Sequence, residues 1–197
     1  HSPHSSASPV HWTLLELGVP FESVVLDLKA GEQKKPAYLK INPNGKVPAL
    51  VHDGLVIFES TAIQMYLGET FGVDKGLYFA PGPKRTEAMK WLVWTGVTLG
   101  EACSRRFHNA GEYIPAEEHN AKAFARAEAD VQNALRILND AMAGRQYLVG
   151  DHFSLVDLHI TAWLQYLPMM GVDLSAHTNL SSWVERCTSR PLASQAP

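Results

Sequence analysis

The sequence contains only two cysteines, and their placement excludes several kinds of site. Cys103 and Cys187 stand far apart, without a CxxC pair or a spacing typical of metal ligands. We expect both to be small buried hydrophobic residues in a reducing compartment, for which the cytoplasm is the default. The nine histidines form no HExxH or HxxxH pattern on a helix, so the sequence predicts no metal site.

Long apolar runs and blocks of one charge are also missing. No run approaches the ~20 apolar residues of a membrane span. The formal net charge is -3 over 197 residues, without clusters of one sign, which argues against nucleic acid or a membrane as a partner. The chain opens on His1 with no secretory signal, and we expect leading residues with a first strand to be absent from it.

The first part of the chain alternates short helix and strand patterns. We expect a helix over residues 8–17, with Ser8 as its N-cap and Gly18 at its end. The alternation in "FESVVLDL" predicts a strand over residues 21–28. The polar stretch "GEQKKP" follows, and "PAYLKINP" has room for one or two helical turns only.

A predicted hairpin comes next, and its first strand contains a proline. Residues 47–52 and 55–58 flank Asp53-Gly54, a pair typical of two-residue hairpin turns, and a helix then opens at Ser60. Pro48 cannot donate to a β-ladder. We therefore predict a cis peptide bond before Pro48, since cis bonds are essentially confined to proline and mark deliberate turns.

Beyond residue 72 the strand patterns stop. Glycine and proline cluster over residues 72–83, as in a linker. Helical patterns cover residues 84–109, 116–143, a stretch that opens at Ser154 with Asp157 in the capping-box position, and 180–189. We therefore predict an α/β domain over residues 1–74, a linker over 75–83 and an all-α domain over 84–197.

The hairpin predicts a binding site for a short peptide. A turn before Pro48 would leave the backbone of Val47 at the sheet edge, where an extended peptide can pair. The helix start at Ser60 favours a carboxylate, and Glu59 can pair with an ammonium. Lys34, Lys35 and Lys46 supply cations for a second carboxylate, and glutathione has these groups. Taken singly, each feature has a plainer interpretation: a strand start, a cap and solvated charges.

The stretch "NPNGKVPAL" followed by "FESTAI", together with "FSLVDLHI", resembles the cytosolic glutathione transferase family over nearly the whole chain, as a bacterial-type member. The resemblance implies a thioredoxin-like N-terminal domain plus an all-α C-terminal domain. It also implies a homodimer that acts in detoxification, with glutathione as co-substrate and a hydrophobic electrophilic small molecule as partner.

The resemblance assigns the glutathione site as follows. Val47, next to Pro48, would hold the cysteinyl backbone, and Glu59 and Ser60 would bind the γ-glutamyl end. Lys46 would approach the glycyl carboxylate. Gln33 and Lys34 resemble part of a "GEHKKP" stretch of plant-type members that binds the same carboxylate.

The residue that activates the thiol lies in "SPHSSASP" by the same resemblance. The serine position of plant-type classes falls on His4 and the cysteine position of a bacterial class on Ser6, with Ser5 between them. No cysteine occurs there, which disfavours thiol–disulfide chemistry of the glutaredoxin or omega kind. We predict that Ser5 or Ser6 donates to the thiolate, with His4 as an alternative donor. Otherwise Ser5, Ser6 and Ser8 only satisfy backbone groups.

The electrophile pocket should lie between the domains. Its candidate lining residues are Trp91, Trp94, Arg105, Phe107, Tyr113, Met169 and Met170, although aromatic residues at helical spacing are more often core. Two hypotheses remain open at this point: an enzyme that conjugates glutathione, and a non-catalytic glutathione-binding or protein-interaction module of the same fold.

Overall fold

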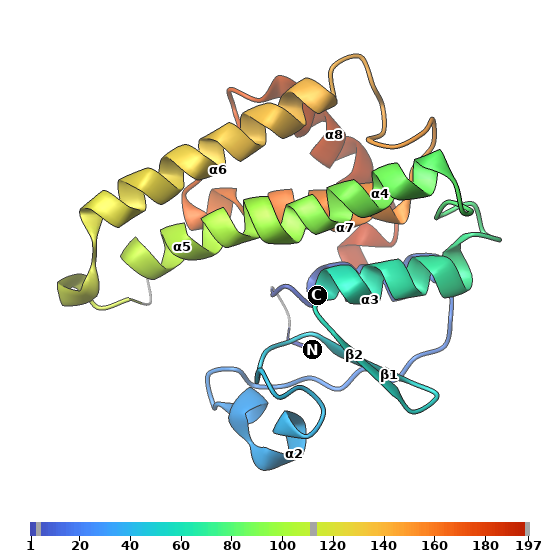
Figure 1. Ribbon diagram of the computed structural model, residues 1–197, viewed down its shortest axis with the longest axis horizontal. Helices are drawn as coiled ribbons and strands as arrows, with labels where there is room; N and C mark the ends of the chain where they lie inside the picture. Colours follow the sequence, from blue (N-terminus) through green and yellow to red (C-terminus); the bar gives the residue numbers. More distant parts are fainter. Residues whose placement is uncertain (3–4, 111–113, 196–197) are drawn as a thin grey trace.

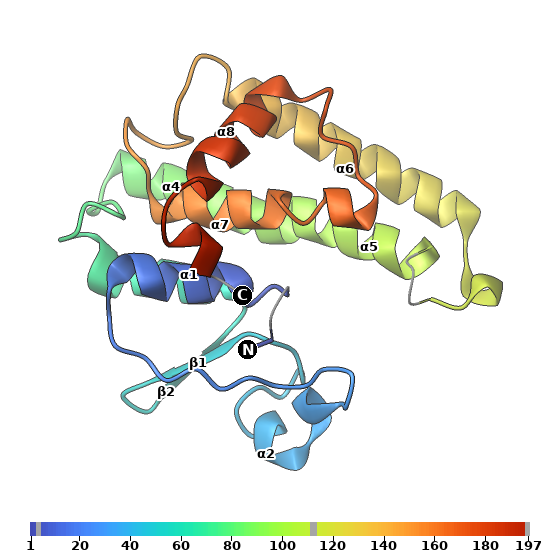
Figure 2. The ribbon, with the colours of Figure 1, turned by 180° about the vertical axis from the view of Figure 1, so that it is seen from behind.

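A computed structural model describes residues 1–2, 5–110 and 114–195 (Figures 1 and 2). The helices and strands are, in chain order, α1 Ser8–Leu17, α2 Pro36–Leu39, β1 Ala49–His52, β2 Leu55–Phe58, α3 Ser60–Leu67, α4 Pro83–Trp94, α5 Glu101–Ala110, α6 Ala121–Ala141, α7 Leu155–Leu164 and α8 Thr178–Thr188. The predicted combination of a small thioredoxin-like α/β part and an all-α part is confirmed.

The elements are stacked in layers. The β1–β2 hairpin lies between α2 on one side and α1 with α3 on the other, and the C-terminal helices cover α1 and α3 (Figures 1 and 2). Ile63 and Leu67 of α3 are fully buried, as their spacing of four residues predicts. Helices α1 and α3 therefore form the shared core between the two parts.

The hairpin has the predicted turn. Strands β1 and β2 pair antiparallel with Ala49 opposite Phe58 and His52 opposite Leu55. Asp53 and Gly54 both have positive φ, 50° and 79°. A tight turn of this kind requires positive φ at both central residues, which glycine and aspartate tolerate.

The strand predicted over residues 21–28 is wrong. Val24 and Val25 remain 61% and 59% exposed, and the segment runs extended without a neighbouring strand. The segment forms two backbone hydrogen bonds with His1. The His1 amino group donates to the Val24 carbonyl at 2.7 Å, and the His1 carbonyl accepts from the Leu26 N–H at 2.8 Å. A groove of about 730 Å³ separates this segment from β1. A strand needs a paired edge, and here the edge faces a groove.

Two helix starts differ in their capping. Helix α1 begins with Ser8 as its first residue and Ala7 as its N-cap, so the prediction of Ser8 as N-cap is wrong. The predicted capping box of α7 is confirmed. The buried Asp157 carboxylate accepts from the Ser154 N–H at 3.0 Å, and also from the Leu148 N–H and the Trp183 indole. Burial raises the pKa of Asp157, whereas these donors favour its ionised form.

The single helix predicted over residues 84–109 is two helices in line. A π-helical turn over Thr95–Gly100 joins α4 to α5, so the pair forms one rod across the molecule (Figure 1). Helix α6 packs along α5, and α7 and α8 lie behind the rod in the view of Figure 1 and in front of it in Figure 2.

Buried polar contacts fix the two parts to each other. The Thr13 hydroxyl donates to the Gln64 side-chain oxygen at 2.8 Å, and the Gln64 amide donates to the Leu155 carbonyl at 2.9 Å. This chain of bonds joins α1, α3 and α7. Almost one turn further along α1, Glu16 makes a bidentate ion pair with Arg190, at 2.8 and 2.7 Å. The N-terminal part is thus rigidly placed against the helical part.

Candidate functional site

The hairpin register brings the two predicted halves of the site together. Ala49 pairs with Phe58, and continuing this register places Val47 across from Ser60. The Val47–Pro48 peptide bond is cis, as predicted. Val47 and the start of α3 at Ser60 are therefore neighbours, although thirteen positions separate them in the chain.

Val47 presents a backbone that is only partly used. Its N–H has no hydrogen-bond partner among the described residues, and its carbonyl accepts from the Ser6 hydroxyl at 2.9 Å. The preceding carbonyl, that of Lys46, is held by the Tyr38 hydroxyl at 2.8 Å and the Asn42 amide at 2.7 Å. The turn is thus fixed by side chains, while the Val47 N–H has no partner within the described residues and could pair with an extended peptide.

The start of α3 is uncapped. Glu59 precedes the helix with φ 70° and ψ 117°, a conformation that non-glycine residues adopt at a cost. Within the described part of the chain, neither the Glu59 carboxylate nor the Ser60 hydroxyl makes a hydrogen bond or ion pair. The first N–H groups of α3 receive no side-chain cap. Unused donors and the positive end of the helix dipole favour an anion here.

Basic residues gather around the turn before Val47. The Lys34 ammonium donates to the carbonyl of Asn44, two residues before Lys46, at 3.3 Å. Gly45 makes this approach possible, because a Cβ there would lie 2.8 Å from the Lys34 ammonium. The Gln33 amide donates to the Leu28 carbonyl at 3.3 Å, and its buried side-chain oxygen has no described partner.

Lys35, the third lysine of the predicted cationic group, has a different environment. Its ammonium pairs with Glu32 at 2.9 Å. The charge of Lys35 is therefore already compensated, and Lys34 and Lys46 are the better placed cations for a carboxylate.

The N-terminal loop places both candidate serines on backbone carbonyls. The Ser5 hydroxyl donates to the Ser2 carbonyl at 2.5 Å and accepts from the Ala7 N–H at 3.1 Å. The Ser6 hydroxyl bonds across to Val47. Both hydroxyls thus bond backbone groups, and a role for either serine toward a thiol stays a prediction. His4 lies outside the described residues.

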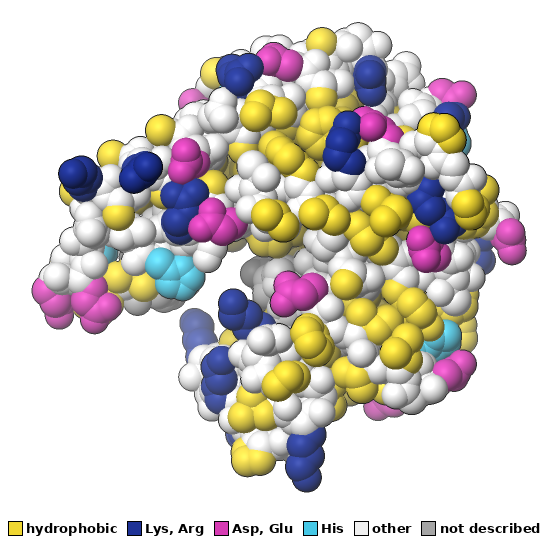
Figure 3. Space-filling view, viewed as in Figure 1, with side chains coloured by type: hydrophobic (Ala, Val, Ile, Leu, Met, Phe, Trp, Pro, Cys, Tyr) yellow, Lys and Arg dark blue, Asp and Glu magenta, His cyan; other side chains and the backbone are white. Residues whose placement is uncertain are grey.

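A second cavity, of about 470 Å³, opens beside this loop. Its walls come from the loop, α1, α5, α6, α7 and the turn after α7: Ser5, Ser6, Pro9, Arg106, Phe107, Ala110, Phe124, Ala162, Trp163, Tyr166, Leu167, Met169 and Met170. Figure 3 shows the molecule hollowed between the helical layer and the α/β part, with basic and acidic side chains at the lower edge.

Arg106 is the cation in this wall, and its charge is compensated. Its guanidinium pairs with Glu128, donates to the Met170 carbonyl at 2.6 Å and to the Gly171 carbonyl at 3.2 Å, and lies 4.8 Å from the Phe124 ring centre. The rest of the wall is mostly aromatic or aliphatic. The cavity therefore suits a neutral apolar molecule.

Only part of the predicted lining reaches this cavity. Phe107, Met169 and Met170 line it, whereas Trp91 and Trp94 do not and instead pack against each other, with ring centres 5.4 Å apart. Tyr113 lies outside the described residues.

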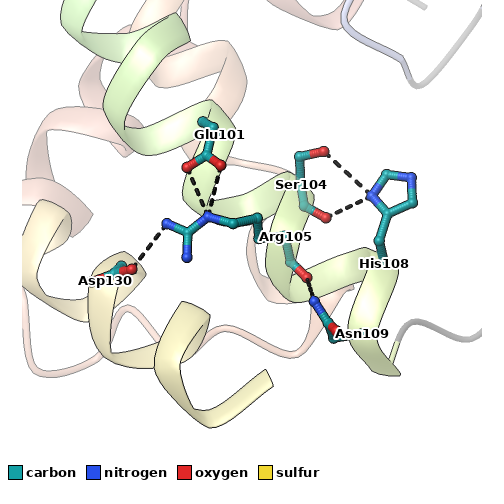
Figure 4. A network of polar contacts seen from close by, with 6 residues as sticks. All are labelled: Glu101, Ser104, Arg105, His108, Asn109 and Asp130. Atoms are coloured by element: carbon teal, nitrogen blue, oxygen red, sulfur yellow. Dashed lines mark hydrogen bonds and ion pairs between the residues drawn. The ribbon is translucent and has the colours of Figure 1, made fainter. Parts of the chain in front are cut away.

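Arg105 points away from the cavity as well. Its guanidinium binds both oxygens of Glu101, at 2.7 and 2.8 Å, and Asp130 at 2.9 Å (Figure 4). Arg105 therefore ties α5 to α6 on the surface, and its placement in the pocket wall was wrong.

Sequence reasoning missed several aromatic wall residues. Trp163 and Tyr166 precede the predicted Met170 at steps of three and four residues, a spacing that continues one face of α7 into the turn after it. This period was a usable signal. Phe124, near the start of α6, carried none.

Two further features were sought in the described part of the chain: a metal site and a membrane-spanning helix. No group of three His, Cys, Asp or Glu side chains there could hold a metal ion. None of the described helices has both the length and the apolar composition that crossing a membrane requires.

Comparisons with known proteins agree with this geometry. The family model "Glutathione S-transferase, N-terminal domain" matches residues 1–69, and "Glutathione S-transferase, C-terminal domain" matches residues 110–191. The disulfide-bond oxidoreductase YfcG of Escherichia coli is 30% identical over 194 residues, which cover 93% of this chain and 86% of YfcG.

Two solved structures illustrate the similarity in three dimensions. A sphingomonad glutathione S-transferase complexed with glutathione superposes with a TM-score of 0.86 at 29% identity, covering 100% of this chain and 94% of that one. The nitrogen regulation fragment of the yeast prion protein Ure2p superposes with a TM-score of 0.88 at 25% identity, covering 99% and 93%.

Proposed function

The chain belongs to the glutathione S-transferase superfamily, and we propose that it binds glutathione and transfers the cofactor's sulfur to an apolar electrophile. The observation that carries the proposal is that one hairpin register brings the Val47 N–H, which has no partner within the described residues, next to the uncapped start of α3. One extended tripeptide can use both at once. Its central residue would pair with Val47 and its acidic end would reach Ser60.

The two ends of glutathione match the charges around this edge. The α-carboxylate of the γ-glutamyl end would accept from the Ser60 hydroxyl and the first N–H groups of α3, and its ammonium would meet Glu59. The glycyl carboxylate would meet Lys46 and Lys34, with Gln33 as a further donor. Hydrogen bonds that involve charged groups contribute about 1.5–3 kcal/mol each, which is enough for specific binding.

Attack on an electrophile requires the thiol of the bound glutathione to ionise. A free thiol has a pKa near ~8.5, and lowering it by two units requires about 2.7 kcal/mol of preference for the thiolate. A helix N-terminus contributes about 0.3–1 kcal/mol. A hydroxyl donor from the loop that holds His4, Ser5 and Ser6 would supply the remainder.

The cavity beside the loop would hold the electrophile. With an aryl chloride, the thiolate sulfur forms the S–C bond and chloride leaves with the electron pair of the C–Cl bond. The compensated charge of Arg106 favours a neutral substrate in this cavity, because a charged one would find no opposite charge to offset its desolvation.

Titration with glutathione tests the binding step. We expect the wild type to bind at millimolar glutathione or below, and Ser60→Ala or Glu59→Gln to weaken binding roughly 10- to 100-fold. Ser181→Ala, on α8 and away from the site, is the matched control and should bind as the wild type does. A wild type that does not bind at millimolar glutathione overturns the proposal.

The ultraviolet absorbance of the bound thiolate separates the enzyme from the non-catalytic module. A band that titrates below the pKa of free glutathione supports catalysis, and release of chloride from an aryl chloride then measures it. Binding without such a band near neutral pH supports the module.

A second candidate reaction is disulfide reduction in which glutathione supplies both thiols. It is favoured by the similarity to YfcG, whose name describes it as a disulfide-bond oxidoreductase. The bound thiolate would attack a disulfide, breaking its S–S bond and releasing one thiolate, which takes up a proton. A second glutathione thiolate would attack the mixed disulfide, releasing the other thiol and glutathione disulfide. Both cysteines of the chain are buried and would take no part.

The proposal includes a homodimer in the cytoplasm, where glutathione is kept reduced. Met89, Val93 and Val97 are 42%, 47% and 69% exposed at steps of four residues along α4 and the π-helical turn. An apolar stripe of this kind fits the surface that a second copy would cover.

A further inference from the structure

We propose that the Tyr38 hydroxyl is a positioning group for glutathione, because it fixes the peptide plane whose N–H would donate to the cofactor. This plane is the peptide unit that joins Lys46 to Val47. The inference rests on the proposed function and adds to it a residue of α2 that lies outside the predicted binding set.

Two side chains hold one end of this peptide unit. The Lys46 carbonyl accepts from the Tyr38 hydroxyl at 2.8 Å and from the Asn42 side-chain amide at 2.7 Å. A carbonyl oxygen has two lone pairs, so both acceptor positions of this oxygen are occupied. The Val47 N–H, at the other end of the same unit, has no partner among the described residues. The two donors therefore act on a peptide group that is held on its carbonyl side only.

The planarity of the peptide bond converts these contacts into an orientation of the N–H. The bond between Lys46 and Val47 is trans, so its N–H and its C=O point in opposite directions. Because the carbonyl is directed at Tyr38 and Asn42, the N–H is directed away from α2. Rotation of the plane would break both hydrogen bonds. The N–H is thus oriented before a ligand arrives, which lowers the entropic cost of binding.

The same hydrogen bonds make the Val47 N–H a stronger donor. Hydrogen bonds in a chain polarise one another, and each is strengthened by roughly 10–30%. A ligand carbonyl that accepts from Val47 would complete a chain that runs from the Tyr38 hydroxyl through the peptide group. Loss of the hydroxyl would therefore weaken the ligand's hydrogen bond at a distance.

The backbone after α2 brings Tyr38 and Asn42 to the same oxygen. The Tyr38 carbonyl accepts from the N–H groups of Ile41 and Asn42, at 2.8 and 2.9 Å. Asn42 is only 2% exposed, and its side-chain oxygen accepts from the Asn44 N–H at 3.1 Å, so this residue also holds its own turn. The Tyr38 hydroxyl has a single hydrogen, which it gives to the Lys46 carbonyl. Its removal should therefore leave the turn standing.

The test combines a change in the protein with a change in the ligand. Tyr38→Phe removes the hydroxyl and keeps the ring. The ligands are glutathione and an analogue in which an (E)-alkene replaces the cysteinyl–glycine peptide bond, so that the carbonyl expected to accept from Val47 is missing. We expect Tyr38→Phe to weaken glutathione binding roughly three- to tenfold and to change the affinity for the alkene by no more than about twofold. The wild type should bind the alkene roughly tenfold more weakly than glutathione.

Tyr66→Phe is the matched control. The Tyr66 hydroxyl lies 2.6 Å from Nδ1 of His52, at the far end of β1 from the Val47 peptide group. This variant also loses a bonded tyrosine hydroxyl next to the hairpin, and it should bind both ligands as the wild type does. Isothermal titration calorimetry measures the affinities, and thermal unfolding checks that both variants are folded.

The contrary results can be told apart. If Tyr38→Phe weakens both ligands equally, the hydroxyl only stabilises the turn and the inference is wrong. If it weakens neither, Asn42 alone orients the peptide group and the inference is wrong as well. A wild type that binds the two ligands equally well does not use the Val47 N–H, which overturns the inference and leaves glutathione binding in place. A wild type that binds neither ligand at millimolar concentration refutes the proposed function itself.

Discussion

Removing the Arg190 side chain should strongly destabilise the attachment of α1 to the C-terminal part. In Arg190→Ala, the Glu16 carboxylate, only 4% exposed, loses both guanidinium bonds and keeps the Trp12 indole donor at 3.1 Å. Arg190 also stacks over the Phe153 ring at 3.9 Å. Breaking a buried ion pair on one side costs about 3–5 kcal/mol, and because Arg190 is itself partly exposed we expect about 3 kcal/mol.

Urea and thermal unfolding measure this loss. For a chain of this size, 3 kcal/mol corresponds to a fall in Tm of roughly 6–12 °C. The matched control is Arg136→Ala, because Arg136 pairs with Asp140 while both side chains are about 60% exposed. Exposed pairs contribute about 0–1 kcal/mol. The double variant Glu16→Gln with Arg190→Met should recover part of the loss, since it leaves no buried charge unpaired.

The reasoning fails if Arg190→Ala and Arg136→Ala lower the free energy of unfolding equally. It fails also if the double variant is less stable than Arg190→Ala, because that result would mean that the buried charge is not the source of the cost.

Two further predictions concern His159 and Gly45. The His159 ring is fully buried, its nitrogens have no partner among the described residues, and burial lowers its pKa to about 4. Because the pKa of the unfolded chain is about 6.5, the free energy of unfolding should fall as the pH drops from 6.5 to 4. In His159→Leu, the decrease in unfolding free energy between pH 7 and pH 4 should be roughly 3 kcal/mol smaller than in the wild type, as measured by urea unfolding. A pH dependence equal to that of the wild type would contradict this prediction. Gly45→Ala should weaken glutathione binding, because the new Cβ would lie 2.8 Å from the Lys34 ammonium and 2.9 Å from the Gln33 carbonyl oxygen. Gly76→Ala, with a similar φ of 66° and open space around it, should carry only the conformational cost of that φ and leave the affinity unchanged. Equal affinities of the two glycine variants in a binding titration would refute the role of Gly45.

The parts of the fold that depend on neighbours in sequence could be predicted. The hairpin, its Asp53-Gly54 turn, the opening of α3 at Ser60 and the α7 capping box all follow from short patterns. The absence of a strand over residues 21–28 could not be predicted. A pattern of alternating residues shows which side would face the core, and it does not show whether a neighbouring strand is there to pair with. The domain limits at residues 74 and 84 stay a prediction.

The cavity was less accessible to sequence reasoning for a related reason. Trp91 and Trp163 are both aromatic residues within helices, and helical periodicity does not distinguish a face that meets another helix from a face that lines a cavity. Arg105 and Arg106 show the same difficulty at adjacent positions. One faces the α6 surface through Asp130 and the other forms part of the cavity wall.

Burial of both thiols has a practical consequence for chemical labelling of the chain. Burial raises the pKa of Cys103 to about 11 and that of Cys187 to about 12, so almost no thiolate of either residue forms at neutral pH. An alkylating reagent added to the folded chain should leave both untouched until the helices around them separate. The rate of labelling at each position would then report how often that region opens, without any dye or engineered probe.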